Sequence, residues 1–280
     1  MRGRTCLITG ATSGIGRVAA LEIARLGAKL TLVARDRGRA EAAVSEIRAE
    51  SRNDEIDFLL ADLSSQQSIR ELARELLARG QPLHVLVNNA GVFALRRSLT
   101  VDGIETVFAV NHLGYFLLTG LLLDRLKESA PARIVNVASD AHSWGTIDFD
   151  DLGGERSYRS MRIYGRSKLA NILFTYELAR RLEGTRVTVN CLHPGAVATR
   201  LGSQNGAIAR FLIGLLRPFL RTPEAGAETV VHLAASPDVE GVSGKYFIDR
   251  HEARSSEESR DPAVAHRLWE LSARMTGLAA

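Results

Sequence analysis

A glycine-rich turn between an apolar strand and a helix constrains the fold of this chain most. Residues 5–9 form a short apolar run, the turn contains Gly10, Gly14 and Gly16, and residues 18–26 carry apolar side chains at helical spacing. Glycines let the backbone turn tightly, so that a pyrophosphate can approach the free N–H groups at the start of the helix. A tight turn without a ligand is the alternative. The flanking strand and helix favour a dinucleotide site.

The alternation of strands and helices continues along the chain and predicts the fold class. Apolar runs that we expect to be strands lie at residues 29–34, 56–61, 84–88, 133–138, 187–192 and 245–248. Helical patterns separate them, including one over 65–79 that begins with a capping-box pattern of Ser64 and Gln67, and a longer one over 103–127. Strands joined by helices form parallel sheets through right-handed crossovers. We therefore expect one doubly wound α/β (Rossmann) domain spanning residues 1–280.

Composition places the chain among ordinary globular proteins. Hydrophobic residues make up 45 % of the 280 residues and charged residues 24 %. The net charge of +4 comes from arginines spread along the chain, which gives little indication of nucleic-acid binding. Cys6 and Cys191 each lie in an apolar run and are expected to be reduced core thiols. Neither cysteine has neighbours at metal-ligand spacing, so no metal site is expected.

Membrane and export segments are not expected either. The first strand follows Met1 to Arg4 directly, which leaves no room for a signal peptide or an N-terminal anchor. No apolar run reaches the roughly 18 residues that a membrane span needs. We therefore expect a soluble cytoplasmic protein.

The end of the second strand indicates the form of the cofactor. In dinucleotide-binding folds an acidic side chain at this point holds the ribose diol and repels a 2′-phosphate. Here Ala34 is followed by Arg35, whose guanidinium can pair with a phosphate, so NADP is favoured over NAD. The alternative is that Asp36 turns inward and Arg35 is merely solvated. After the third strand, Asp62 and Leu63 are positioned to contact an adenine ring.

Tyr164 and Lys168 form the candidate catalytic pair. If they lie on a helix, as the following apolar residues indicate, the two side chains are one turn apart on one face. A phenol with a pKa of about 10 is a poor acid–base catalyst at neutral pH, but a nearby ammonium stabilises the phenolate and lowers that pKa. The spacing alone also occurs by chance on many amphipathic helices.

A series of motifs makes this interpretation specific. In chain order they are TGATSGIG from Thr9, NNAG from Asn88, Asn111, Ser139, Tyr164 with Lys168, and Pro194-Gly195. Together they resemble the short-chain dehydrogenase/reductase family over nearly the whole chain. The segments NVASDAH, SKLANILFTYELA, PFLRTPEAGAETVVHLA and SGKYFID are similar to its retinol dehydrogenase branch. The resemblance implies a seven-stranded parallel sheet with NADP(H) bound at the carboxyl ends of the strands.

The resemblance also implies roles for individual residues. Tyr164 is expected to be the acid–base catalyst, Ser139 to hydrogen-bond the substrate oxygen, Lys168 to lower the phenol pKa and bind the nicotinamide ribose, and Asn111 to hold a water beside Lys168. The residues expected to bind the cofactor are Gly10, Thr12, Ser13, Gly14, Ile15, Gly16, Arg35, Asp62, Leu63, Asn89, Ala90, Gly91, Tyr164, Lys168, Pro194, Gly195, Val197 and Thr199. Two alternatives remain: Asn111 could be a buried structural residue, and Ser139 could cap the end of a strand. For His112 and His193 we expect a structural role.

A dense apolar segment at about residues 200–221 bears on the substrate. It interrupts the alternation after the sixth strand, and we interpret it as a lid over a hydrophobic substrate, with an ordinary amphipathic core helix as the alternative. We expect an NADP(H)-dependent enzyme that interconverts a carbonyl and an alcohol on a hydrophobic, retinoid- or lipid-aldehyde-like molecule. Many retinol dehydrogenases have an apolar anchor before the first strand, which is not expected here, and this weakens the case for retinoids.

Two other functions remain open from the sequence. One is a catalytically silent NADP-binding regulatory protein, against which Ser139, Tyr164 and Lys168 argue. The other is a reductase of the same family that acts on a polar substrate such as a sugar. The long fourth and fifth helices, which follow the fourth and fifth strands, are the usual dimer faces in the family, so a homodimer or homotetramer is a possible assembly.

Overall fold

The computed structural model describes residues 1–197 and 220–278, in which one eight-stranded sheet forms the centre. In sheet order the strands are β3 (Ile56–Leu60), β2 (Lys29–Ala34), β1 (Thr5–Thr9), β4 (Val85–Asn88), β5 (Ala132–Val137), β6 (Val187–His193), β7 (Tyr246–Ile248) and β8 (His251–Ala253). All neighbouring strands are parallel except β7 and β8. The expected doubly wound α/β fold is confirmed.

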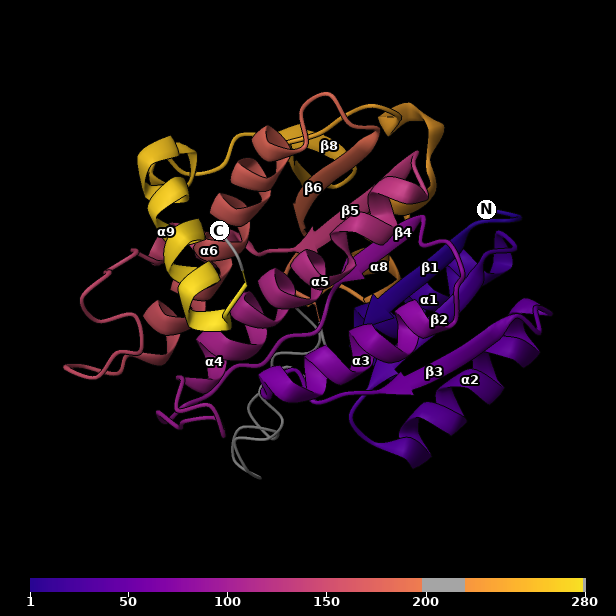
Figure 1. Ribbon diagram of the computed structural model, residues 1–280, viewed down its shortest axis with the longest axis horizontal. Helices are drawn as coiled ribbons and strands as arrows, with labels where there is room; N and C mark the ends of the chain where they lie inside the picture. The colour runs from indigo at the N-terminus through magenta and orange to yellow at the C-terminus, as the bar shows by residue number, and fades with distance from the viewer. Residues whose placement is uncertain (198–219, 279–280) are drawn as a thin grey trace.

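Helices cover both faces of the sheet. One layer contains α1 (Gly14–Arg25), α2 (Arg37–Ser51) and α8 (Pro223–Ala235), and the other contains α3 (Gln66–Ala78), α5 (Gly114–Glu128), α6 (Ser160–Arg181) and α9 (Pro262–Thr276). Figure 1 views the molecule from the side of α3, α5 and α9, with α8 behind the sheet. Because the strands are buried on both faces, they consist of nearly continuous apolar residues rather than alternating ones.

The eighth strand differs from the seven that were expected. Ile248 pairs with His251, so only Asp249 and Arg250 form the turn, and both have positive φ (50° and 67°). This is the backbone pattern of a type I′ hairpin, which sequences usually mark with Asn-Gly or Asp-Gly. Here the turn has no glycine, and an ion pair between Asp249 and Arg221 supports it from outside the hairpin. The strand was therefore not recognisable from its local sequence.

The carboxyl ends of the parallel strands form one edge of the sheet, where the motif residues gather. The order reverses between β1 and β4, which is the switch point where dinucleotide-binding folds place their ligand. The glycine turn follows β1, the NNAG loop follows β4, Ser139 follows β5 and Pro194 follows β6. Of the expected lid at residues 200–221, all but the last two residues lie outside the described part of the chain.

The helix over Thr106–Glu128 corrects one expectation about membrane segments. It is continuous through α4 (Thr106–Phe108), the π-helical turn η1 (Ala109–Leu113) and α5. With 23 residues and a mean hydropathy of 1.6 it is long and apolar enough for a membrane span, contrary to the expectation from sequence. However, 78 % of its most apolar window is buried inside the protein. This is the environment of a core helix, which the same length and composition also fit.

Candidate active site

The glycine turn packs directly against the end of β4. Gly10 has a φ of +68°, and a Cβ atom there would lie 2.8 Å from the Cα of Ala90. A Cβ atom on Gly16 would lie 2.4 Å from both the Nδ2 of Asn89 and the carbonyl oxygen of Gly10. Gly10 is therefore required for its left-handed backbone as well as for space, and Gly16 for close packing alone.

The start of helix α1 presents backbone donors that suit an anion. The expected cofactor residues of this region lie in the turn or in the first helical turn: Gly10, Thr12, Ser13, Gly14, Ile15 and Gly16. Ser13 is the N-cap residue, but its side chain makes no capping hydrogen bond. No acidic residue lies in the first turn of this helix. A helix start with positive dipole and no capping side chain fits the pyrophosphate of a dinucleotide.

Asn89 holds the loop after β4 against the glycine turn. Its Nδ2 donates to the carbonyl oxygens of Thr9 at 2.9 Å and Gly10 at 3.2 Å. In return, the backbone N–H groups of Asn89 and Ala90 donate to the Thr9 Oγ1 at 2.9 and 3.1 Å. Because these bonds join the two loops on either side of the switch point, Asn89 fixes the shape of the expected cofactor cleft.

Tyr164 and Lys168 lie one turn apart on α6, as their spacing predicted. The Lys168 Nζ is 5.7 Å from the centre of the Tyr164 ring and donates a hydrogen bond of 2.9 Å to the carbonyl oxygen of Val137. Lys168 is buried, whereas Tyr164 keeps some exposed surface and meets the edge of Phe93, with ring centres 5.7 Å apart. The pair therefore sits beside the end of β5, at the edge of the sheet that also carries the glycine turn.

Burial, rather than mutual attraction, governs the protonation of this pair. It raises the pKa of Tyr164 to about 12, although a hydrogen bond with the Ser139 side chain opposes the rise. It lowers the pKa of Lys168 to about 7. Lys168 is not among the groups that shift the pKa of Tyr164, so the expected lowering of the phenol pKa by Lys168 stays a prediction. At neutral pH Tyr164 is protonated and suited to donate a proton.

Ser139 lies two residues after the end of β5, and its side chain forms a hydrogen bond with Tyr164. Its backbone is extended, with a φ of −168° and a ψ of 154°, and its Oγ accepts a hydrogen bond of 3.2 Å from the Ala141 N–H. It thereby caps the 3₁₀ helix η2 (Asp140–Trp144), whereas the structural alternative expected from the sequence was the cap of a strand end. The hydroxyl hydrogen stays available, and the hydrogen bond with Tyr164 brings the two candidate catalytic oxygens together.

Asn111 occupies the π-helical turn η1. Its Oδ1 accepts from the Val92 N–H at 2.8 Å, and its Nδ2 donates to the Val92 carbonyl oxygen and to the Ser167 Oγ, both at 3.0 Å. A Cβ atom on Gly91 would lie 3.5 Å from the Asn111 Oδ1 and 3.7 Å from the Lys168 Nζ, so both groups border the same glycine. π-helical turns are frequent at functional sites. That Asn111 also holds a water for Lys168 stays a prediction.

The residues expected around the adenine lie at the ends of β2 and β3. Arg35 is exposed directly after β2, and the Asp36 carboxylate accepts a hydrogen bond of 2.8 Å from the Arg39 N–H as the N-cap of α2. The Asp62 carboxylate accepts two hydrogen bonds from Ser64. Leu63 is only 6 % exposed and packs in the core, which leaves little of its side chain to contact a ring.

The segment after β6 lies against the start of α1. Gly195 has a φ of +87°, and Val197 forms an isolated bridge with Arg221. A Cβ atom on Gly226 would meet the Val197 Cγ2 at 2.6 Å and the Ile15 Cγ1 at 3.1 Å. Val197 therefore lies near Ile15 in the first turn of α1, Pro194 and Gly195 precede it in the same loop, and Thr199 lies outside the described residues.

Comparison with known proteins agrees with this arrangement. The model of the short chain dehydrogenase family matches residues 4–207. Retinol dehydrogenase 14 of Mus musculus is 50 % identical over 291 residues, covering 99 % of this chain and 87 % of the relative. Retinol dehydrogenase 12 of Mus musculus is 48 % identical over 276 residues, with coverage of 99 % and 87 %. The chain belongs to the short-chain dehydrogenase family.

Solved structures place the short-chain dehydrogenase fold over the same length. An uncharacterised protein from Mycobacterium paratuberculosis has a TM-score of 0.80 and 32 % identity, covering 99 % of this chain and 94 % of its own. An NADP complex of RhlG from Pseudomonas aeruginosa has a TM-score of 0.70 and 29 % identity, covering 88 % and 94 %. This short-chain dehydrogenase is a nicotinamide-dependent oxidoreductase that acts on CH–OH groups, and it is similar to the retinol dehydrogenases.

Sequence reasoning missed three exposed apolar side chains on segments that meet at the first turns of α6, the helix that carries Tyr164 in this short-chain dehydrogenase. Trp144 is 59 % exposed, Met161 49 % and Leu95 51 %. They come from three segments that meet there: the Ser160 Oγ donates to the Leu95 carbonyl oxygen, and the backbone of Trp144 lies against Gly165. The sequence does not indicate that these three segments meet; we call Leu95, Trp144 and Met161 the apolar rim.

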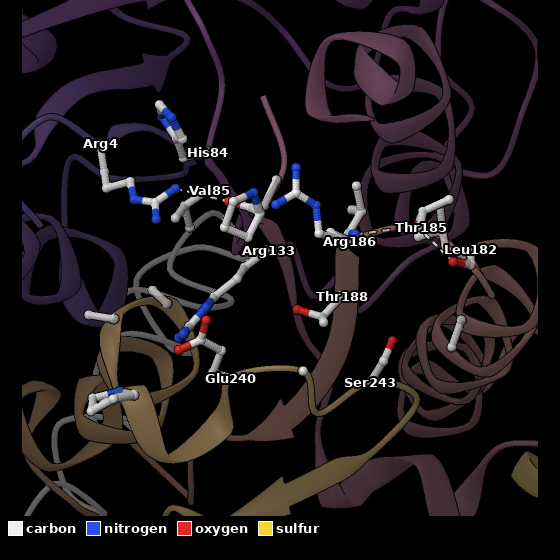
Figure 2. Close-up of a pocket in the computed structure, with 18 of the residues that line it drawn as sticks. Arg4, His84, Val85, Arg133, Leu182, Thr185, Arg186, Thr188, Glu240 and Ser243 are labelled. Carbon is white, nitrogen blue, oxygen red and sulfur yellow. Dashed lines mark hydrogen bonds between the residues drawn. The ribbon is translucent and has the colours of Figure 1, made fainter. Parts of the chain in front are cut away.

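A cavity lies at the opposite end of the sheet from the candidate active site. It has a volume of about 580 Å³ and lies at the amino-terminal ends of β4, β5 and β6, and Figure 2 shows Arg4, His84, Arg133 and Arg186 around it. Arg133 donates to the carbonyl oxygens of Leu233 and Ser236, at the end of α8. Carbonyl groups at a helix C-terminus attract cations, so the position of the Arg133 charge has a structural explanation. The cavity is remote from Tyr164 and is not the candidate active site.

Among the residues that the structure describes, no three His, Cys, Asp or Glu side chains come together as a metal site. The two cysteines are free and buried in β1 and β6, where burial raises the pKa of both thiols. They are core thiols, as expected.

Proposed function

We propose that this short-chain dehydrogenase uses NADP(H) to interconvert a carbonyl and an alcohol on a hydrophobic substrate, such as a retinoid or a lipid aldehyde. The observation that carries the proposal is the meeting of Ser139, Tyr164 and Lys168 beside Gly91 at the carboxyl edge of the sheet. Ligands of doubly wound folds bind at this edge. The 45–50 % identity to retinol dehydrogenases supports the same substrate class.

The three polar side chains have complementary roles in this proposal. The Ser139 hydroxyl donates to the substrate oxygen and fixes its position next to the Tyr164 hydroxyl. In reduction Tyr164 donates its proton to that oxygen, for which its raised pKa keeps it in the correct form. Lys168 binds the nicotinamide ribose, and its buried amine holds positive charge near the phenolate that Tyr164 becomes. The bound nicotinamide supplies the hydride, or accepts it in oxidation.

The preference for NADP(H) rests on Arg35 and Asp36. The Asp36 carboxylate is engaged in capping α2, so the alternative in which it turns inward to hold a ribose diol is disfavoured. Arg35 is exposed at the same strand end, where a guanidinium can bind a 2′-phosphate. The uncapped start of α1 receives the pyrophosphate.

The hydrophobic substrate follows from the rim formed by Leu95, Trp144 and Met161, together with Phe93 against the Tyr164 ring. Exposed large apolar side chains that gather beside a polar reaction centre are typical of sites that bind apolar molecules. A sugar would leave this rim in contact with water or with hydroxyl groups. A lid formed by residues 200–221 remains part of the proposal.

The substitution Tyr164→Phe tests the catalytic assignment. It removes one hydroxyl and keeps the ring, so we expect turnover to fall by about a thousandfold or more. NADPH binding, followed by fluorescence titration, should stay within about twofold of the unaltered protein. Unchanged turnover in this variant would overturn the assignment of Tyr164.

A substrate panel tests the substrate class separately. Purified protein with NADPH is given all-trans-retinal, nonanal, glyceraldehyde and xylulose, and NADPH consumption is followed by absorbance. The proposal expects kcat/KM for the first two to exceed that for the two sugars by about a hundredfold or more, because each buried CH₂ group adds about 0.8 kcal/mol. Preference for the sugars would favour the polar-substrate alternative. NADPH binding without turnover of any carbonyl would favour a regulatory protein.

A further inference from the structure

Two histidine rings hold the peptide group that joins Ser139 to Asp140. The Nδ1 of His142 lies 2.8 Å from the Ser139 carbonyl oxygen, and the Asp140 N–H donates to the Nδ1 of His193 at 3.1 Å. The carbonyl oxygen and the N–H belong to one planar peptide group, so the two rings bind its opposite polar ends. We call this arrangement the histidine clamp.

The hydrogen-bond partners determine the tautomer of each ring. A carbonyl oxygen only accepts, so the His142 Nδ1 must donate to Ser139; a backbone N–H only donates, so the His142 Nε2 must accept from Ser256 at 3.0 Å. By the same logic, the Nδ1 of His193 must be the unprotonated nitrogen. Both rings are therefore neutral, with His142 protonated at Nδ1 and His193 at Nε2.

The rings are themselves fixed by the fold. His142 is 4 % exposed and meets the ring of Tyr246 on β7 edge to face, with centres 5.3 Å apart. Its Nε2 binds the segment before α9 through Ser256. His193 is the last residue of β6. The clamp thus connects the backbone next to Ser139 with three elements that are distant in sequence.

We propose that His142 and His193 are positioning residues that orient Ser139 for the reaction. This inference rests on the proposed function, in which the Ser139 hydroxyl binds the substrate oxygen. Holding the peptide plane fixes the ψ angle of Ser139 and with it the direction of its side chain. A displacement of the hydroxyl by about 1 Å lowers the rate by roughly a hundredfold when a hydrogen bond must form in the transition state.

The clamp requires unprotonated acceptor nitrogens, so it opens in acid. A proton on the His193 Nδ1 would face the Asp140 N–H, and a proton on the His142 Nε2 would face the Ser256 N–H. Burial lowers the pKa of both rings. The negative charges of Asp140 and Asp249 favour protonation of His193, whereas Arg221 and His142 oppose it. The negative charge of Asp140 also favours protonation of His142. Activity is therefore expected to fall with falling pH as the clamp opens.

Variants of His193 test the clamp with the fastest aldehyde of the panel above. His193→Ala should lower kcat by about tenfold or more while NADPH affinity stays within about twofold. His193→Asn places an amide oxygen near the position of Nδ1, so it should restore most of the rate and remove the part of the acid fall that His193 causes. If His193→Asn were as slow as His193→Ala, the proposed role of the His193 Nδ1 as a hydrogen-bond acceptor would be overturned.

A double variant separates positioning from general damage. If His193 acts through Ser139, then Ser139→Ala with His193→Ala should be no slower than Ser139→Ala alone. A further loss in the double variant would show that His193 acts by another route. Full activity of Ser139→Ala would instead refute the proposed role of Ser139, so the two failures are distinguishable.

The two ends of His142 can be tested in the same way. His142→Asn keeps a donor near the Ser139 carbonyl oxygen, whereas His142→Gln keeps an acceptor near the Ser256 N–H. The clamp predicts the faster rate for His142→Asn, and a faster rate for His142→Gln would show that anchoring residue 256 is what matters. His266→Ala on α9, remote from Ser139, serves as the matched control and should keep the unaltered rate.

Discussion

The Asp36 side chain shows how one residue decides the interpretation of its neighbour. From the sequence, either Arg35 or Asp36 could face the cofactor. In the structure the Asp36 carboxylate accepts a hydrogen bond of 2.8 Å from the Arg39 N–H and begins helix α2. The cap ties the carboxylate to the start of α2, which disfavours the alternative in which Asp36 turns inward, and Arg35 remains exposed at the end of β2.

Replacing Arg35 by alanine is expected to weaken NADPH selectively. A charge-assisted hydrogen bond to phosphate contributes about 1.5–3 kcal/mol, so the Kd for NADPH should rise roughly ten- to hundredfold. NADH lacks the 2′-phosphate, and its Kd should change by less than about twofold. Arg39→Ala is the matched control, because only the backbone N–H of Arg39 makes the cap. Equal losses for both nucleotides would exclude the phosphate contact.

The role of a single residue could be predicted from the sequence where a motif fixes its chemistry. It could not be predicted where burial determines the behaviour of the side chain. Tyr164, Lys168 and Ser139 were found from their motifs and do lie together. The charge state of Lys168 could not be predicted from a motif. Its pKa of about 7 arises from burial by elements that are distant in sequence. The burial of Leu63 was not predictable either: its side chain packs in the core, and its expected contact with adenine stays a prediction.

Among the elements, the starts of helices were more predictable from the sequence than the π-helical turn η1 and strand β8, which depend on contacts with other segments. Pro262 begins α9 after the N-cap Asp261, as the Asp-Pro pattern indicates. The cap of α3 was displaced by one residue: Ser65, not Ser64, is the N-cap, because the Ser64 hydroxyl donates to Asp62. The π-helical turn η1 and strand β8 have no local signal, since each depends on contacts with other segments.

Removal of the α9 cap should lower global stability. The Asp261 carboxylate accepts hydrogen bonds from the N–H groups of Ala263 and Val264. Because α9 packs the Trp269 ring onto Phe116 and Phe174, fraying of its first turn is expected to affect the whole fold. Asp261→Ala should lower the free energy of unfolding by about 1 kcal/mol in urea denaturation.

The control for this cap lies one turn earlier. The Glu257 side chain is 92 % exposed, so Glu257→Ala should change the unfolding free energy by less than about 0.5 kcal/mol. If the two variants were equally stable, the cap would contribute nothing measurable.

At the scale of the whole molecule, the sheet brings the site together by placing the carboxyl ends of its parallel strands, β1 to β7, on one edge. This is why a sequence pattern could assign the fold and the approximate site, whereas the apolar rim of Leu95, Trp144 and Met161 emerged only from the folded chain. The same packing buries charged and polar groups throughout the protein. Burial lowers the pKa of five histidines: His84, His112, His142, His193 and His232.

This burial makes the fold sensitive to acid. A histidine whose pKa is lower in the folded than in the unfolded state binds its proton more readily when unfolded. Stability is therefore complete above the unfolded pKa and is lost progressively as the pH falls toward the folded pKa. His112 is the strongest case, because burial lowers its pKa from 6.5 to about 3. It is 1 % exposed, and its Nε2 lies 2.9 Å from the Ser272 Oγ of α9.

His112→Gln is expected to flatten this pH dependence. Between the two pKa values the unfolded chain holds one more proton at this residue, which removes about 1.4 kcal/mol of stability per pH unit. Glutamine can still hydrogen-bond Ser272 but does not titrate. The variant should be less stable than the unaltered protein at about pH 7.5, yet lose about 2 kcal/mol less on acidification to about pH 5, measured by urea denaturation. Parallel losses in the two proteins would mean that His112 is protonated in the folded state, and that other groups cause the sensitivity to acid.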